Sequence, residues 1–222
     1  MSPDLGANKI RRVDIVDDKP DVRKVIAICV KEAELEAVLE NDPLPPLEQF
    51  VKAAMNKADA GICDHKLNLA SYAKFDGAEA VAQFYQYKWP ALLCTTWGKA
   101  VIDAMRVYRR RIPVLIKPDD LDPDTIATGF ECCIREFNND FSPSRRPWRT
   151  LVRIEEVDKD MVPPMFFAVL PGWHSSDKIK LSLSLIPPQL QTRIKPGARF
   201  HAQVNKGAEN QDELYFENFQ FD

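Results

Sequence analysis

Five side chains that could take part in phosphoryl chemistry follow short apolar segments of the chain. Asp17 and Asp18 follow the first of these segments, Asp64 the second, Thr95 the third and Lys117 the fourth. Carboxylates can hold a divalent cation, and one of them can attack phosphorus as a nucleophile. A hydroxyl and an ammonium group can bind the oxygens of the transferred group. These residue types therefore indicate a carboxylate that accepts a phosphoryl group with the help of a divalent metal ion.

The four apolar segments are typical of buried strands. They comprise residues 13–16, 60–63, 91–94 and 112–116. In an open parallel α/β sheet the carboxyl ends of the strands share one edge, and ligands bind there. We therefore expect the acidic, hydroxyl and lysine side chains to converge in one cleft.

Stretches with apolar residues at helical spacing separate these strands. They comprise residues 22–33, 47–54, 81–85, 101–108 and 126–137. Residues 36–39 are a candidate for a further short strand after the first helix. Five strands alternating with five helices predict an α/β fold with a parallel, doubly wound sheet.

Taken together, these features resemble the receiver domain of two-component response regulators, over about residues 10–141. In that resemblance Asp64 is the phosphoacceptor and Asp17 and Asp18 are the acidic pair. Lys117 is the lysine that a proline follows, and Thr95, 22 residues before it, is the switch hydroxyl. The resemblance implies a flavodoxin-like sheet with strand order 2-1-3-4-5.

The resemblance also implies a magnesium site. The metal would be held by Asp17, Asp18, Asp64 and the backbone carbonyl of Lys66, all of them oxygen ligands of the kind that Mg²⁺ prefers. The partner that donates the phosphoryl group would be a histidine kinase. The protein would then be a phosphoacceptor rather than an enzyme, with at most the ability to remove its own phosphoryl group.

The chain departs from the family pattern near the predicted site. The position three before Lys117, commonly an aromatic that rotates on activation, is Val114. The segment between Asp64 and Gly77 is longer than usual, and Thr96-Trp97 replaces small residues after the switch threonine. These departures leave a second interpretation open, in which the domain is a receiver-like scaffold that is not phosphorylated.

Helical periodicity ends at a polar, proline-containing linker, residues 142–150. Beyond it, alternating apolar and polar residues predict about five strands. These lie at residues 151–157, 165–170, 179–185, 200–204 and 214–221. We therefore predict a receiver domain over residues 1–141 and a small antiparallel β-domain, a barrel or sandwich, over residues 151–222.

The charge of the C-terminal part helps to define its role. Residues 142–222 contain 11 lysines and arginines against 10 aspartates and glutamates. A DNA-binding output domain usually carries a basic surface and a recognition helix, so nucleic acid is not the expected partner. We expect the β-domain to bind a protein, either the kinase or a downstream effector. A regulator that binds nucleic acid through a β-barrel is the remaining alternative.

The composition indicates an ordinary globular chain. The 222 residues are 45% apolar and 28% charged, with a net charge of −3. No segment has the length of a membrane span and the first residues lack a signal-peptide pattern, so we expect a cytoplasmic protein. The five cysteines lack the spacing of a zinc site, and the chain has no glycine-rich phosphate loop. The oligomeric state is left open.

Overall fold

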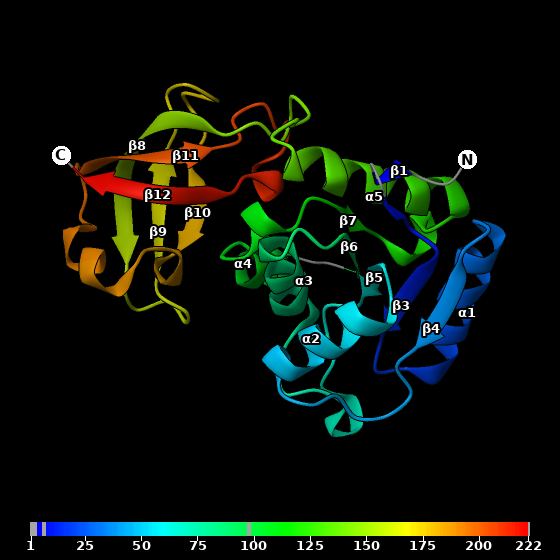
Figure 1. Cartoon of the computed structure of the whole chain (residues 1–222). Coiled ribbons are helices and arrows are strands. Elements are labelled where there is room, and N and C mark those ends of the chain that lie inside the picture. Colours follow the sequence, from blue (N-terminus) through cyan, green and yellow to red (C-terminus); the bar gives the residue numbers. More distant parts are fainter. Residues whose placement is uncertain (1–3, 6–7, 97–98, 222) are drawn as a thin grey trace. The chain divides into compact units, whose positions relative to one another are not determined.

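The computed structural model describes residues 4–5, 8–96 and 99–221, which fall into two compact units (Figure 1). The first unit comprises Met1–Trp97 and Arg111–Asp140, and the second comprises Gly98–Arg110 and Phe141–Asp222. The chain thus passes between the units three times. No helix in the described ranges is long and apolar enough to cross a membrane.

The first unit contains a five-stranded parallel sheet in the order β4-β3-β5-β6-β7. The strands are β3 (Arg12–Val16), β4 (Glu36–Leu39), β5 (Ala60–Cys63), β6 (Ala91–Cys94) and β7 (Leu115–Ile116). This is the predicted 2-1-3-4-5 order, and it confirms the flavodoxin-like α/β fold. A short antiparallel pair, β1 (Asp4–Leu5) and β2 (Asn8–Lys9), precedes the sheet.

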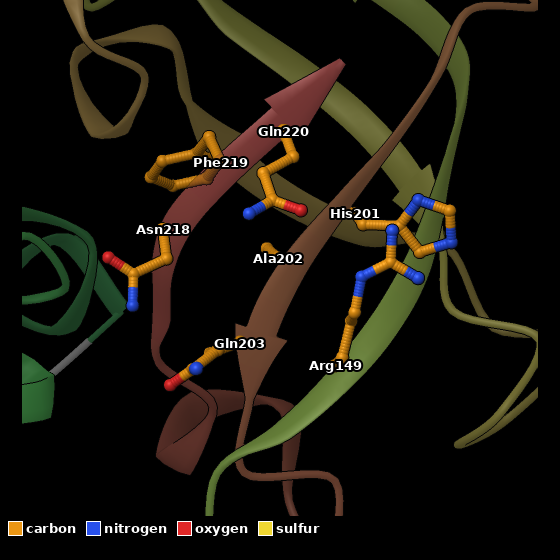
Figure 2. A pocket seen from close by; sticks show the side chains of 7 residues that line it. All are labelled: Arg149, His201, Ala202, Gln203, Asn218, Phe219 and Gln220. Atoms are coloured by element: carbon orange, nitrogen blue, oxygen red, sulfur yellow. The ribbon is translucent and has the colours of Figure 1, made fainter. Parts of the chain in front are cut away.

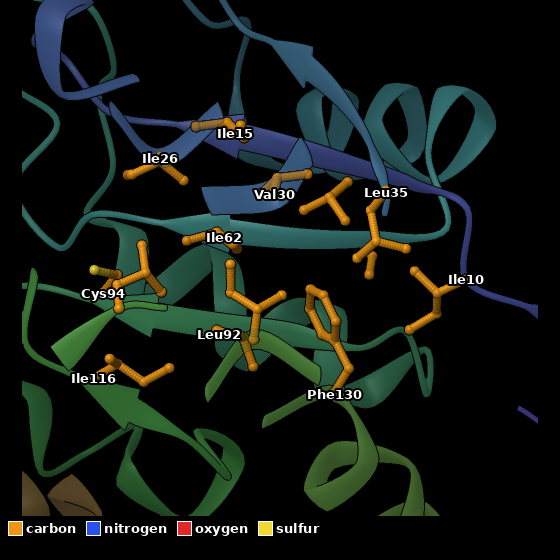
Figure 3. Close-up of a cluster of buried hydrophobic side chains, with 14 of the residues drawn as sticks. Ile10, Ile15, Ile26, Val30, Leu35, Ile62, Leu92, Cys94, Ile116 and Phe130 are labelled. Atoms are coloured by element: carbon orange, nitrogen blue, oxygen red, sulfur yellow. The ribbon is translucent and has the colours of Figure 1, made fainter. Parts of the chain in front are cut away.

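Two pairs of helices cover the faces of this sheet (Figure 1). They are α1 (Pro20–Glu32) with α5 (Pro123–Phe137), and α2 (Leu47–Lys57) with α3 (Gly77–Gln86). On the first face, strand residues such as Ile15 and Leu92 form one buried core with Val30 and Phe130 of the helices (Figure 3). Each helix therefore packs against the sheet through its apolar face.

The last parallel strand is shorter than the sequence predicts. We expected a strand over residues 112–116, whereas β7 begins only at Leu115. Pro113 has no backbone N–H and cannot donate to the ladder of a neighbouring strand. The backbone N–H of Leu93 in β6 donates to the carbonyl of Val114, just before β7 begins.

The second unit contains a five-stranded antiparallel sheet in the order β10-β9-β8-β11-β12. Its strands are β8 (Trp148–Asp158), β9 (Met165–Val169), β10 (Ile179–Ser182), β11 (Arg199–Val204) and β12 (Phe216–Phe221). One face carries alternate apolar side chains, such as Val152 and Phe200, that are fully buried in a single core. The predicted antiparallel β-domain is therefore confirmed, and its strands form one sheet.

The third of the predicted strands in this sheet ends early. Alternation continues to Leu185, but β10 stops at Ser182 and a 3-10 turn, Leu183–Leu185, follows. The Ser182 hydroxyl accepts the backbone N–H of Ser184 at 3.3 Å. This hydrogen bond to a side chain gives the backbone a partner other than a neighbouring strand, just where β10 ends. The alternation of apolar and polar residues does not reveal it.

The segment Gly98–Arg110 packs within the second unit, although the predicted boundary placed it in the receiver domain. Its helix α4 (Lys99–Met105) ends three residues before the predicted end at Tyr108. Arg106 is buried and its guanidinium donates to the carbonyls of Gln211 and Leu214, at 2.8 and 2.9 Å. These buried hydrogen bonds explain why the segment groups with the C-terminal strands.

Two further arginines strengthen this packing. The Arg110 guanidinium lies 3.0 Å from the carboxylate of Glu217 in β12. Arg145 donates to the carbonyls of Arg109 and Arg110 at 3.1 and 2.9 Å, and its own carbonyl accepts from the Tyr215 hydroxyl. Backbone carbonyls at the end of a helix need such donors when they are removed from water.

Candidate functional site

The predicted site residues all lie at the carboxyl edge of the parallel sheet. Asp17 follows β3, Asp64 follows β5, Thr95 follows β6 and Lys117 follows β7. These four strands are consecutive neighbours in the sheet. The topology therefore brings together positions that are up to 100 residues apart in sequence.

Three carboxylates form the centre of the site. Asp17, Asp18 and Asp64 each offer an oxygen, and these oxygens lie within 4.8 Å of one another. Asp17 is 4% and Asp18 is 9% exposed. Burial raises the pKa of Asp17 to about 6, with a smaller contribution from the carboxylates of Asp64 and Asp18 and a partial offset by the backbone N–H of Lys19. Burial also raises the pKa of Asp64. The cluster is thus under strong electrostatic repulsion when it is ionised.

Neighbouring donors act on the charge of the Asp64 carboxylate. The Thr95 hydroxyl and the backbone N–H groups of His65 and Lys66 all favour its ionised form and lower its pKa, against the larger effect of burial. The backbone behind it is closely packed, since a Cβ on Gly77 would lie 1.7 Å from the Asp64 carbonyl oxygen. Only glycine therefore fits at the start of α3 beside this strand end.

The long segment after Asp64 folds over the acidic cluster. The backbone N–H of Leu69 donates to Asp18 Oδ2 at 2.7 Å. Tyr72 is buried, and its hydroxyl donates to the carbonyl of Glu40 at 2.8 Å. Ala70 and Ser71 between them have left-handed φ values of 51° and 58°. Such conformations are unfavourable for residues other than glycine, so the surrounding contacts must impose them.

Arg23 supports the site and was not among the predicted residues. It lies on α1, is 3% exposed, and donates to the backbone carbonyl of Asp17. Its guanidinium also lies over the ring of Tyr72, 5.4 Å from the centroid. It thus connects the acidic pair to the loop that covers it. An arginine at a position that helical spacing assigns to the apolar face of α1 is the sequence signal that could have identified it.

Lys117 and Lys66 occupy the same edge of the sheet. Lys117 is exposed and caps the 3-10 turn Pro118–Asp120. The side chain of Lys66 lies 3.4 Å from the carboxylate of Asp76, while its backbone N–H faces Asp64. The roles predicted for the Lys66 carbonyl as a metal ligand and for Lys117 as a phosphoryl ligand remain predictions.

The departures from the family pattern have structural counterparts. Val114 is half-buried and packs against the core of the first unit. Thr96 is exposed, and Trp97 lies outside the described residues. The structure therefore places no aromatic side chain at the position three residues before Lys117.

The site has the chemistry of a magnesium site. All of the converging ligand atoms are carboxylate oxygens, which suit Mg²⁺ better than soft transition metals. Asp17 Oδ1 accepts the N–H of Lys19, and Asp18 Oδ2 accepts that of Leu69. Each carboxylate keeps a second oxygen for a metal. A divalent cation would also compensate the charge of the Asp17 carboxylate, whose pKa is raised by burial and, to a smaller extent, by Asp64 and Asp18.

No protein-family model matches the sequence, and no curated protein is significantly similar to it. Many structures similar to the N-terminal part are response regulator receiver domains. One, from Clostridium thermocellum, has 10% identity and a TM-score of 0.44, covering 59% of this chain and 98% of that chain. A DNA-binding response regulator of the LuxR family from Staphylococcus aureus has 14% identity and a TM-score of 0.43, covering 55% and 99%. The C-terminal sheet is not identified by these structures.

Proposed function

We propose that the protein is a phosphoacceptor in a two-component-type signalling pathway and that Asp64 carries the phosphoryl group. The observation that supports this most directly is the cluster of three carboxylates beside the Thr95 hydroxyl. A purely structural role would not favour three acidic side chains within 4.8 Å of one another, because their mutual repulsion opposes folding.

The chain's own residues account for the transfer. An Asp64 oxygen attacks phosphorus, a P–O bond to aspartate forms, and the bond to the donor group breaks, with the electron pair leaving on the donor. The donor is a phosphohistidine of a kinase or a small acyl phosphate. Mg²⁺ held by Asp17, Asp18, Asp64 and the carbonyl of Lys66 would neutralise charge on the phosphoryl oxygens.

Thr95 and Lys117 would bind the phosphoryl oxygens. The Thr95 hydroxyl lowers the pKa of the Asp64 carboxylate, and a bound phosphoryl group would become an acceptor for this hydroxyl. Lys117 follows the adjacent strand at the same sheet edge. Both groups would stabilise negative charge that the carboxylate alone repels.

The output is proposed to pass through protein contacts of the C-terminal unit. Segment 98–110 begins three residues after Thr95 and packs within that unit through Arg106. A shift of residues 95–96 would therefore act on a segment that is fixed to the β-domain. A change in partner affinity requires that the partner bind the two states differently.

The test is incubation with acetyl phosphate and Mg²⁺, followed by intact mass measurement. We expect one added phosphoryl group in the native chain and none in Asp64→Asn. Asp42→Asn, which removes a charge from an exposed loop position, serves as the matched control and should label normally. Equal labelling of Asp64→Asn would remove Asp64 from the mechanism. If neither acetyl phosphate nor a phosphorylated kinase domain labels the native chain, the domain is instead a receiver-like scaffold that is not phosphorylated.

A further inference from the structure

The outer face of the C-terminal sheet carries cationic side chains that the described chain leaves without partners. Side chains that point away from the core alternate along β8 and β11, and there Arg153 stands directly opposite Arg199. Arg153 is bonded to Glu155 at 2.5 Å. Arg149 and Arg199 are exposed, and their side chains have no hydrogen bond or ion pair with any residue that the structure describes. Like charges directly opposite each other destabilise a sheet.

A β-bulge opens a polar hollow beside these arginines. His201 pairs with Gln220 and Gln203 pairs with Glu217, so β12 has one residue more than β11 between the two pairs. Asn218 takes up the extra length with a left-handed φ of 53°. The hollow measures about 300 Å³, and its walls include Arg149, the imidazole of His201 and three carboxamides (Figure 2). Bulges commonly redirect side chains at functional positions.

A second hollow includes Arg199, which lies on the same strand as His201 and Gln203 of the first. It measures about 530 Å³ and is lined by Arg193, Lys195, Arg199 and Phe221, with no carboxylate among its lining residues. Arg199 and His201 are two positions apart on one face of β11, which separates them by about 7 Å. A ligand that spans this distance would contact Arg199 of the second hollow and His201 of the first.

The nearby carboxylates already have partners. Glu155 is bonded to Arg153, and Glu217 lies 3.0 Å from Arg110. The face therefore has a local excess of positive charge, although the C-terminal part is almost neutral in total. An anionic ligand would be complementary to this face.

We propose that the two hollows bind a nucleoside di- or triphosphate. Three cations in the second hollow suit a group with several negative charges, and guanidinium groups bind phosphate oxygens in pairs. The carboxamides of Gln203, Asn218 and Gln220 offer donors and acceptors to an uncharged polar heterocycle. The phosphates would accordingly lie against Arg193, Lys195 and Arg199 and the base against the carboxamides. This site is separate from the Asp64 cluster.

Calorimetric titration of the full chain tests the proposal. The probes are the diphosphates of adenosine, guanosine, cytidine and uridine, together with pyrophosphate alone. We expect at least one diphosphate to bind, and Arg199→Ala to weaken it and pyrophosphate tenfold or more. Gln203→Ala should weaken the diphosphate and leave pyrophosphate unchanged, because it removes only a base contact. Lys159→Ala, an equal charge change at an exposed loop residue, is the control and should bind as the native chain does.

Three results would overturn the proposal. The first is that no diphosphate gives a heat of binding at millimolar concentration although the protein sample is folded, as its unfolding temperature shows. The second is equal weakening by Arg199→Ala and Lys159→Ala, which indicates only general charge attraction. The third is binding of a single-stranded RNA oligonucleotide with a steep salt dependence while the diphosphates do not bind. Asp64→Asn should bind nucleotide normally, so failure here is distinguishable from failure of phosphorylation.

Discussion

Asp14 gives a quantitative test of the electrostatics beneath the site. It lies in the middle of β3, is 1% exposed, and neither carboxylate oxygen has a hydrogen bond. Lys57 Nζ is 3.6 Å from Oδ1, which is an electrostatic contact, and Lys57 is also paired with Glu40. Burial, partly offset by Lys57, raises the pKa of Asp14 from 3.8 to about 6.

The sign of the effect follows from linkage. Between about pH 4 and pH 6 the folded state holds a proton that the unfolded state has lost, so the free energy of unfolding falls as the pH rises. Above about pH 6 Asp14 is ionised in both states, and its burial lowers the free energy of unfolding by about 3 kcal/mol. This value corresponds to two pKa units at about 1.4 kcal/mol each. Asp14→Asn removes this penalty but buries an amide without a full set of partners, which costs about 1 kcal/mol.

We therefore expect Asp14→Asn to stabilise the fold by about 2 kcal/mol at pH 7 and to destabilise it by about 1 kcal/mol near pH 4. Urea unfolding followed by tryptophan fluorescence, with a chelator present and Asp42→Asn as the control, measures both values. The reasoning is refuted if the difference between variant and native chain is independent of pH. It is also refuted if the variant is the less stable protein at pH 7.

Three further predictions concern single contacts. Gly77→Ala should destabilise the fold by about 1–3 kcal/mol or more and reduce phosphorylation, because its Cβ would overlap the Asp64 carbonyl; a native melting temperature would contradict this. Arg106→Leu leaves the buried carbonyl of Leu214 without its side-chain donor, while the carbonyl of Gln211 keeps the backbone N–H of Leu214; it should cost about 1–3 kcal/mol in urea unfolding, whereas an unchanged free energy of unfolding would argue against the packing of this segment. Asp18→Ala should lose both Mg²⁺ binding in calorimetry and phosphorylation, and normal labelling at low Mg²⁺ would exclude it as a ligand.

The hydrophobic pattern was sufficient to predict the parallel sheet and the edge at which the site lies. The strands at residues 60–63 and 91–94 are short, fully apolar and followed by polar residues. Their ends could therefore be predicted to the residue. Pattern alone could not reveal side-chain caps, as at Ser182, or the missing donor of Pro113 within an apolar run. Both depend on individual hydrogen bonds rather than on periodicity.

The covering loop and the assignment of α4 could not be predicted for a different reason. The bond from Leu69 to Asp18 uses a backbone N–H, which any residue type could supply. The packing of α4 depends on carbonyls of Gln211 and Leu214, more than 100 residues away. Helical periodicity predicts which face of α4 is apolar, but it does not predict which of the two units that face packs against.

The assignment of residues 98–110 to the C-terminal unit has a consequence for the modularity of this protein. Many multidomain chains can be cut or recombined at a single linker, because each domain is one continuous stretch. Here a cut at residue 141 would leave α4 in the N-terminal fragment and its carbonyl acceptors in the other. Exchange of the β-domain between proteins would therefore require two insertions rather than one fusion. The two units are interlaced in sequence, and they are expected to be inherited and expressed together.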